Sequence, residues 1–225
     1  MIERGVIPNR GPHHPQAMAT GEYNRQQMEA FLTVRRYLEG LSPSRMSRIK
    51  GWVRAYLTFR GEVAQFQKQH FSEICTYTCF TSQTSACCGR EGIATFFADV
   101  VINVLLSSDR EVDVILETLS RDFGGFKCVY LKEQGCLWRL KPIVCEMFLC
   151  KRAKDAVLEG NRVLGAQWDK LRRRERRYTW PNRPVLFDRL EELFVQAGLE
   201  SPLMYFHRSP GLLRVKKQFL KKQGQ

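Results

Sequence analysis

Apolar residues recur at helical spacing along most of the chain, so the pattern predicts a mainly α protein. The first periodic segment runs from about Asn24 to Leu38. A second follows the interruption LSPSR, where Ser42 or Ser44 is placed to cap it, and keeps its apolar period as far as Phe66. Together the two segments predict a helical hairpin in the N-terminal third.

The middle of the chain predicts two more helices and then short extended segments. Residues 89–108 are strongly apolar but include Asp99 and Asn103, which favours a buried helix of about four turns over a membrane span. Residues 108–122 predict a shorter helix. Aromatic and β-branched residues then concentrate in FKCVYL and CLWRL, which predicts extended segments joined by a turn at Gly135.

The C-terminal third predicts a long basic helix over residues 146–177, then a proline-rich link and an amphipathic helix ending at Gly198. We therefore expect a helical protein with a cysteine-rich metal-binding core that contains short extended segments. Its expected parts are a flexible tail (1–22), an N-terminal helical segment (23–70), a cysteine-cluster metal-binding domain (71–150) and a basic C-terminal helical extension (151–225).

Charge is distributed unevenly over these parts. Lys and Arg outnumber Asp and Glu by 11 to 5 in residues 1–70 and by 18 to 8 in residues 151–225, whereas residues 71–150 hold 7 against 10. The basic flanks allow contact with an acidic protein, a nucleic acid or a membrane surface. A solvated surface is the simpler interpretation of the same charges.

The cysteines are the most informative feature of the sequence. All eight lie between positions 75 and 150, in two runs of four. A disulfide framework normally also ties down the termini and long loops, so this confinement favours a local site for a metal or a cluster. The candidate ligands are Cys75, Cys79, Cys87, Cys88, Cys128, Cys136, Cys145 and Cys150.

The spacing of the cysteines excludes the commonest metal motifs. The first run is C-x3-C-x7-C-C and the second is C-x7-C-x8-C-x4-C, so neither contains the paired C-x2-C of a zinc ribbon or the closely spaced run of a ferredoxin. Ligands from separated segments must therefore converge in the fold. Thiolate ligands select zinc, copper(I) or an iron–sulfur cluster over magnesium or calcium, so the expected cofactor is one of these soft centres.

Eight thiols can supply two four-sulfur sites, or one site with four further thiols. Cys87 and Cys88 bear on this choice, because successive side chains of an extended backbone point to opposite faces and can serve two neighbouring centres. Any single cysteine, Cys128 for example, can instead be an ordinary core residue. Lys141, Arg139 and Arg90 lie close in sequence and can supply positive charge to a thiolate cluster.

The cysteine segment resembles the YkgJ-type cysteine-cluster family of zinc- or iron-chelating proteins, which are related to flagellin lysine N-methylases. The resemblance is carried by Cys87-Cys88-Gly89 with Asp99 in the following helix, and by the ending Lys-Pro-x2-Cys-x4-Cys at residues 141–150. It covers residues 75–150. The segment FTSQTSA lengthens the spacing between Cys79 and the vicinal pair relative to that family.

These observations predict a cytosolic protein that binds zinc or an iron–sulfur centre through up to eight thiolates. One alternative, implied by the resemblance, is a metal-dependent protein-modifying enzyme similar to the flagellin lysine N-methylases. The other is a module that binds nucleic acid or an acidic partner through the basic flanks. Residues 170–180 (KLRRRERRYTW) combine arginines with Tyr178 and Trp180, a composition suited to phosphates and bases. No recognised nucleic-acid module accompanies it, so a solvated helix is the simpler interpretation of this segment.

Overall fold

The computed structural model describes residues 20–81, 88–89, 94–121, 127–180, 184–204 and 221. Within these ranges the protein is mainly α-helical, as predicted, and two very short strands form its single described sheet. No helix in the described part of the chain combines the length and the apolar character needed to cross a bilayer. Most of the expected tail (1–22) lies outside the described residues.

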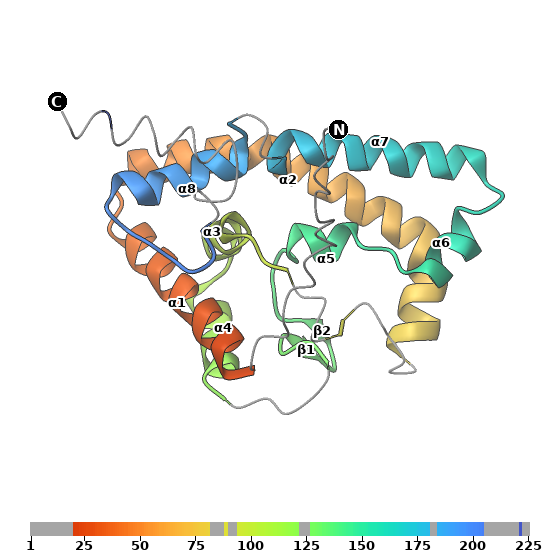
Figure 1. Cartoon of the computed structure of the whole chain (residues 1–225), viewed down its shortest axis with the longest axis horizontal. Helices are drawn as coiled ribbons and strands as arrows, with labels where there is room; N and C mark the ends of the chain where they lie inside the picture. Colours follow the sequence, from red (N-terminus) through yellow and green to blue (C-terminus); the bar gives the residue numbers. More distant parts are fainter. Residues whose placement is uncertain are drawn as a thin grey trace, which may run out of the picture.

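The first two helices, α1 (Thr20–Glu39) and α2 (Pro43–Phe71), confirm the predicted helical segments. Ser42 caps α2 by accepting a hydrogen bond from the Arg45 N–H at 3.4 Å, and Pro43 begins the helix without losing a needed donor. The two helices diverge from their connecting turn, since α1 packs mainly on α3 and α4 while α2 packs on α7 (Figure 1). The predicted hairpin is therefore wrong in its packing.

The chain continues from α2 into η1 (Ser72–Phe80), a π-helix that carries Cys75 and Cys79. Helix α3 (Phe97–Leu106) is shorter than predicted, because Thr95 and Phe96 precede it in extended conformation and the Asp99 carboxylate accepts the Phe96 N–H. Helix α4 (Asp109–Leu119) begins as predicted, with a capping box between Ser108 and Glu111.

The predicted extended segments form a hairpin that is shorter than expected. Strand β1 (Leu131–Lys132) pairs antiparallel with β2 (Gly135–Cys136) across a two-residue loop. Gly135 follows this loop with a φ of 112°, which confirms the predicted turn and uses a conformation that L side chains rarely adopt. Cys128 lies before β1 and outside the hairpin. Its carbonyl accepts the Leu131 N–H in a turn that leads into the strand.

We expect Gly135→Ala to lower the free energy of unfolding by about 1–2 kcal/mol, because a Cβ at this φ is strained even though space surrounds it. Gly61→Ala is the matched control, since Gly61 is exposed within α2 and a Cβ there also meets open space. The control should raise stability by up to about 1 kcal/mol. Chemical denaturation of both variants measures the difference, and equal effects would contradict the strain argument.

The prediction of a single basic helix over residues 146–177 is wrong. Three helices take its place: α5 (Ile143–Met147), α6 (Lys151–Val157) and α7 (Arg162–Thr179). Gly160 adopts a φ of 81° and Asn161 caps α7 through the Leu164 N–H, so the break between α6 and α7 has a local cause. The final amphipathic helix, α8 (Leu186–Gln196), ends before Gly198 as predicted.

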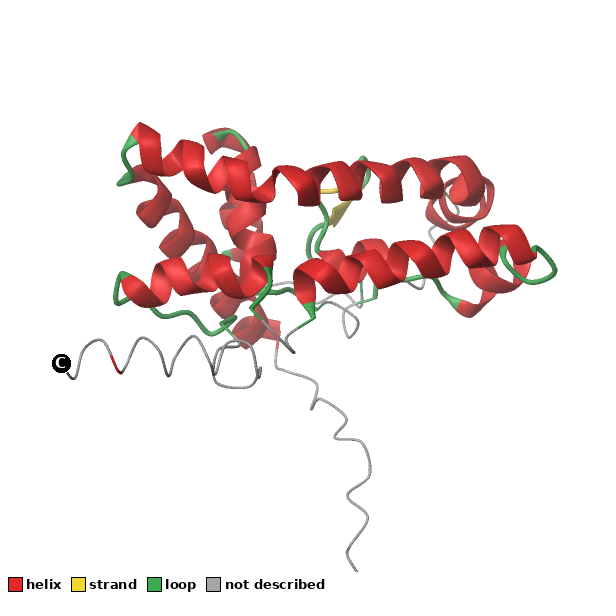
Figure 2. Cartoon of the chain, turned by 90° about the horizontal axis from the view of Figure 1, so that it is seen from above, coloured by secondary structure: helices red, strands yellow, loops and turns green. Residues whose placement is uncertain are grey.

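One hydrophobic core joins helices that are distant in the sequence. The Phe97 ring of α3 meets Phe194 of α8 at 4.8 Å, and the Phe31 ring of α1 meets Trp138, just after β2, at 5.2 Å. Seen from above, α2 runs along one side of the molecule, and α7 followed by α8 runs along the other (Figure 2). Hydrogen bonds with α1, α2 and α3 hold the hairpin and the start of α5. These three helices therefore form part of the surroundings of the second cysteine run.

Candidate metal centre

The hairpin brings three of the predicted cysteines onto adjacent backbone. Cys136 ends β2 opposite Leu131, and the Leu137 N–H donates to the Tyr130 carbonyl at 2.9 Å. The Cys128 N–H in turn donates to the Cys88 carbonyl at 2.8 Å, next to an antiparallel bridge between residues 89 and 127. The first cysteine run thus joins the second through the backbone of Cys88, which the sequence alone does not reveal.

Cys145, on α5, belongs to the same group of thiols. Its pKa is raised to about 12, first because burial disfavours the thiolate and then because charge on Cys128 or Cys136 would repel it. Cys128 has a pKa of about 11, raised by burial and further by Cys136. Each of these three sulfurs therefore lies within electrostatic range of the other two. Without a cation, all three remain neutral thiols at pH 7.

Backbone N–H groups face these sulfurs and favour their charged form. The N–H groups of Tyr130 and Leu131 offset part of the rise in the Cys128 pKa that burial causes. The pKa of Cys136 is also raised by burial, and the Trp138 N–H opposes that rise. Such N–H donors are the groups that stabilise metal-bound thiolates.

A second group of thiols lies at the other end of α5. Cys150 caps α6 and its sulfur accepts the Ala153 N–H at 3.4 Å. Helix α6 packs against the π-helix η1, where Cys75 and Cys79 are four residues apart. A π-helix has more residues per turn than an α-helix, so these two positions share one face. Cys75, Cys79 and Cys150 thus lie on two elements that pack together, and we call them the π-helix group, in distinction from the hairpin group of Cys88, Cys128, Cys136 and Cys145.

The chemistry of the hairpin group fits a soft metal ion, but its spacing is not that of a formed metal site. In the ranges that the structure describes, no three His, Cys, Asp or Glu side chains converge where they could hold a metal ion. Cys87 lies outside the described residues. Metal binding would therefore have to draw the sulfurs together, and it would stabilise the segments that carry them.

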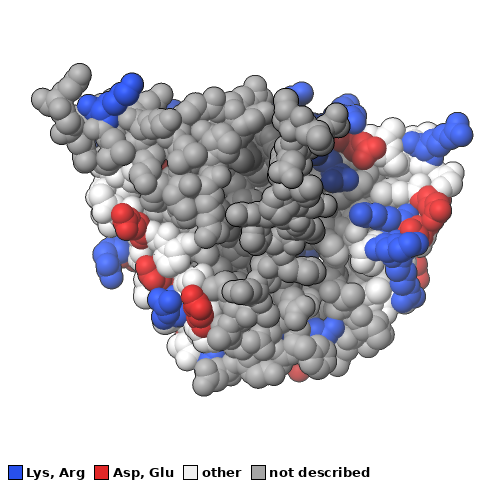
Figure 3. Space-filling view, in the orientation of Figure 1, with Lys and Arg blue, Asp and Glu red and all other residues white. Residues whose placement is uncertain are grey.

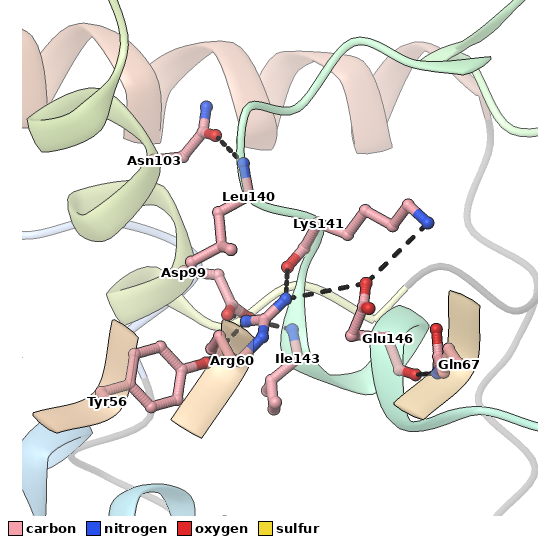
Figure 4. Close-up of polar contacts among 9 residues, drawn as sticks. All are labelled: Tyr56, Arg60, Gln67, Asp99, Asn103, Leu140, Lys141, Ile143 and Glu146. Carbon is pink, nitrogen blue, oxygen red and sulfur yellow. Dashed lines mark hydrogen bonds and ion pairs between the residues drawn. The ribbon is translucent and has the colours of Figure 1, made fainter. Parts of the chain in front are cut away.

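A buried polar network holds the backbone between Cys136 and Cys150 (Figure 4). Its centre is Arg60 of α2, which is 2% exposed and donates to the Tyr56 hydroxyl at 2.8 Å and to the Lys141 carbonyl at 2.6 Å. The Arg60 guanidinium also lies 3.9 Å from the Glu146 carboxylate, whose side chain is 9% exposed. The guanidinium therefore joins α2 to both sides of Pro142.

Two polar side chains of α3 also bind the backbone of this segment. The Asp99 carboxylate accepts the Ile143 N–H at 3.1 Å, and the Asn103 side-chain oxygen accepts the Leu140 N–H at 3.1 Å (Figure 4). Burial raises the pKa of Asp99 to about 7, while the charge of Arg60 and the N–H of Ile143 lower it in part. The backbone entering Cys145 is thus fixed by side chains from two helices.

Buried hydroxyl groups of α1 and its neighbours face the hairpin group. The Tyr130 hydroxyl donates to Gln27 at 3.0 Å, which ties the hairpin to α1. Burial raises the Tyr23 pKa far above its usual value, and charge on Cys128 or Cys145 would raise it further. The Tyr23 hydroxyl lies near the hydroxyls of Thr95 and Tyr130, which lower its pKa in part, although it meets no partner at ideal hydrogen-bonding geometry among the described residues. Tyr23 is therefore a buried hydroxyl within electrostatic range of Cys128 and Cys145.

Of the three basic residues singled out near the cysteines in sequence, only Lys141 is shown to act on the thiols of the described residues. Lys141 lowers the pKa of Cys136 and Cys145 by its charge, although its side chain is 53% exposed, as that of an ordinary surface lysine would be. Arg139 instead pairs with Glu111 at 3.2 Å, and Arg90 lies outside the described residues. The sequence analysis missed Arg60, although an arginine on the apolar stripe of α2 is a readable sign of a buried polar role.

Comparisons with known proteins identify no relative. No family model, no curated protein and no solved structure matches the chain. The resemblance to the YkgJ-type family therefore stays a prediction that rests on the spacing of the cysteines.

Proposed function

We propose that this protein binds zinc or an iron–sulfur centre through its clustered cysteine thiolates. The observation that carries the proposal is the grouping of Cys128, Cys136 and Cys145. These thiols come from three different backbone segments, are largely buried, and lie within range of one another's charge. A bound cation would convert this unfavourable burial into a favourable one, because it binds thiolates and compensates their charge.

The two groups of thiols favour two neighbouring centres over a single one. The hairpin group holds four cysteines, and the π-helix group holds three, on elements that pack together. Cys87 follows from the sequence as a further ligand, since it is adjacent to Cys88. The metal would supply charge compensation and cross-linking, while Arg60, Asp99 and Asn103 hold the backbone that presents the ligands.

The assignment of two groups can be tested by titrating reduced, full-length protein with cobalt(II), which develops thiolate charge-transfer absorption when it enters a sulfur site. We expect C128S/C136S and C75S/C79S each to lose part of the bound cobalt, and their combination to lose all of it. If both double variants keep the full stoichiometry of the unchanged protein, the proposal is wrong.

Tyr23→Phe tests whether the buried hydroxyl serves the hairpin group. We expect zinc affinity to fall about tenfold, because a neutral phenol beside Cys128 and Cys145 can donate to a thiolate. Without metal, the free energy of unfolding should change by less than about 1 kcal/mol, since the hydroxyl there has no partner at hydrogen-bonding geometry among the described residues. Competition against a chelating dye measures the affinity.

Tyr37→Phe is the control for this experiment, because Tyr37 lies on the same helix and packs its ring on Phe194 at 4.4 Å, away from the thiols. It should leave zinc affinity unchanged. Equal affinities for the Tyr23 and Tyr37 variants would exclude a role for Tyr23 at the metal. The enzyme alternative rests on the family resemblance alone and stays a prediction.

A further inference from the structure

An open cavity lies where α2, α7 and α8 meet, away from the cysteine segment. Its volume is about 550 Å³, within the range of sites that hold a nucleotide-sized ligand. Arg177 and Arg189 line it together with Trp52, one acidic residue, Glu192, and the apolar residues Pro184, Val185 and Leu186. Both arginines are exposed to solvent. With two arginines against one glutamate, the cavity combines a net positive charge with an apolar wall.

Of the two arginines that line the cavity, Arg189 stacks on the Trp52 ring. The guanidinium carbon of Arg189 lies 3.7 Å from the centre of the Trp52 ring, and that of Arg48 lies 5.5 Å from it. A guanidinium stacked on an aromatic ring keeps its N–H edge available for a phosphate while it loses conformational freedom. The cavity thus presents pre-oriented donors for an anionic group.

Basic residues continue along both helices that lead away from the cavity. Residues 43–58 of α2 contain no acidic residue and include Arg45, Arg48 and Arg54, whereas Lys50 of the same segment lines a separate cavity with Glu39 and Asp109. Residues 170–180 contain six basic residues and one acidic residue. The two segments adjoin, since the Tyr178 hydroxyl donates to the Ala55 carbonyl at 3.3 Å. At the end of α7, Trp180 is 51% exposed and Arg176 lies 5.3 Å from its ring centre.

The excess of positive charge on these segments of α2 and α7 contrasts with the mixed charges elsewhere on the surface. On the face drawn in Figure 3, the described basic side chains at both flanks stand beside acidic ones. At the junction the three helices meet, since Arg189 of α8 stacks on Trp52 of α2 and Tyr178 of α7 hydrogen-bonds to Ala55 of α2. The cavity and its basic helices therefore form a distinct surface, which we call the junction surface (Trp52, Arg177, Arg189 and the flanking residues 43–58 and 170–180).

We infer that the junction surface binds single-stranded nucleic acid, with a phosphate held by Arg177 and Arg189 and a base packed against the apolar wall. Single-strand binders combine a basic track for the backbone with flat side chains on which bases stack. A base in a duplex is not free to enter a concave cavity, and the Asp and Glu side chains of an acidic peptide have no ring to pack on the apolar wall. The inference does not depend on metal binding.

Fluorescence anisotropy with a labelled twelve-nucleotide single strand, measured on the full-length protein, tests this inference. We expect R177A/R189A to weaken binding by about tenfold or more, and to reduce the slope of log affinity against log salt by about 1.4. R152A/K154A is the control of equal charge, because both residues are exposed on α6 at the far end of α2. It should change affinity by less than about twofold. Circular dichroism of both double variants verifies that they are folded.

Equal weakening by the two double variants would overturn the inference, since it would show a general effect of net charge. Equal or tighter binding of the same sequence as a duplex, of polyglutamate or of anionic phospholipid vesicles would also overturn it. Failure of the unchanged protein to bind the strand at 0.1 M salt would do the same. Preference for the single strand over all three competitors, lost only in R177A/R189A, supports it.

Discussion

Serine in place of Cys145 is expected to remove most of the metal bound by the hairpin group and to lower its zinc affinity at least tenfold. A neutral hydroxyl is a poor replacement for a soft thiolate, and Cys145 is the cysteine whose charge would interact with both Cys128 and Cys136. Because the sulfurs must be drawn together on binding, loss of metal should also loosen their segments. Proteolysis between residues 127 and 150 should therefore become faster, while α1 and α2 stay resistant.

Val144→Ala is the control for this variant, because Val144 is the neighbouring half-buried residue of α5. It should lower stability modestly and keep the full metal content. Metal content and the proteolytic pattern are measured on the same sample. If the serine variant keeps its metal and only loses stability, Cys145 is a packed core residue and the assignment of the hairpin group is wrong.

Arg60→Met should lower the free energy of unfolding by about 3 kcal/mol or more. The arginine is the buried partner of Glu146 and supplies positive charge to Asp99. Its removal leaves Glu146 with the half-exposed Lys141 at 3.9 Å and takes away the positive charge beside Asp99. It also removes the donor to the Lys141 carbonyl. Denaturant unfolding of the metal-free protein measures this effect separately from metal binding.

Arg54→Met provides the comparison for Arg60→Met, since Arg54 is exposed on the same helix and should contribute less than about 0.5 kcal/mol. R60M/E146Q should recover part of the loss, because the glutamine carries no unpaired charge. A loss below about 1 kcal/mol in Arg60→Met, or none recovered in the double variant, would contradict the proposed network.

The helices were largely predictable because their signals are local. Ser42 with Pro43 marks the start of α2, and Ser108 with Glu111 marks the start of α4. The break at Gly160 and Asn161 is also local, but a continuous run of basic and helix-favouring residues around it obscured the signal. The divergence of α1 from α2 depends on packing against α3 and α4, which no local pattern encodes.

The sequence identifies the cysteines as candidate ligands, but it does not tell which of them lie close together in the fold. Confinement of the cysteines indicated a local site, but the pairing of Cys88 with Cys128 arises from backbone contact between segments 40 residues apart in sequence. Asp99 and Asn103 were visible as polar residues in an apolar helix. Their role in holding the backbone before Cys145 follows only once α3 is placed beside that segment.

The central claim, that the thiols bind a soft metal, is tested most directly by anaerobic purification followed by metal and acid-labile sulfide analysis with an absorption spectrum. The account predicts zinc in stoichiometric amount in a colourless protein, or iron with sulfide and broad visible absorption, and in either case lower content in Cys145→Ser. Protein that contains neither metal, and that takes up neither under reducing conditions, would contradict it.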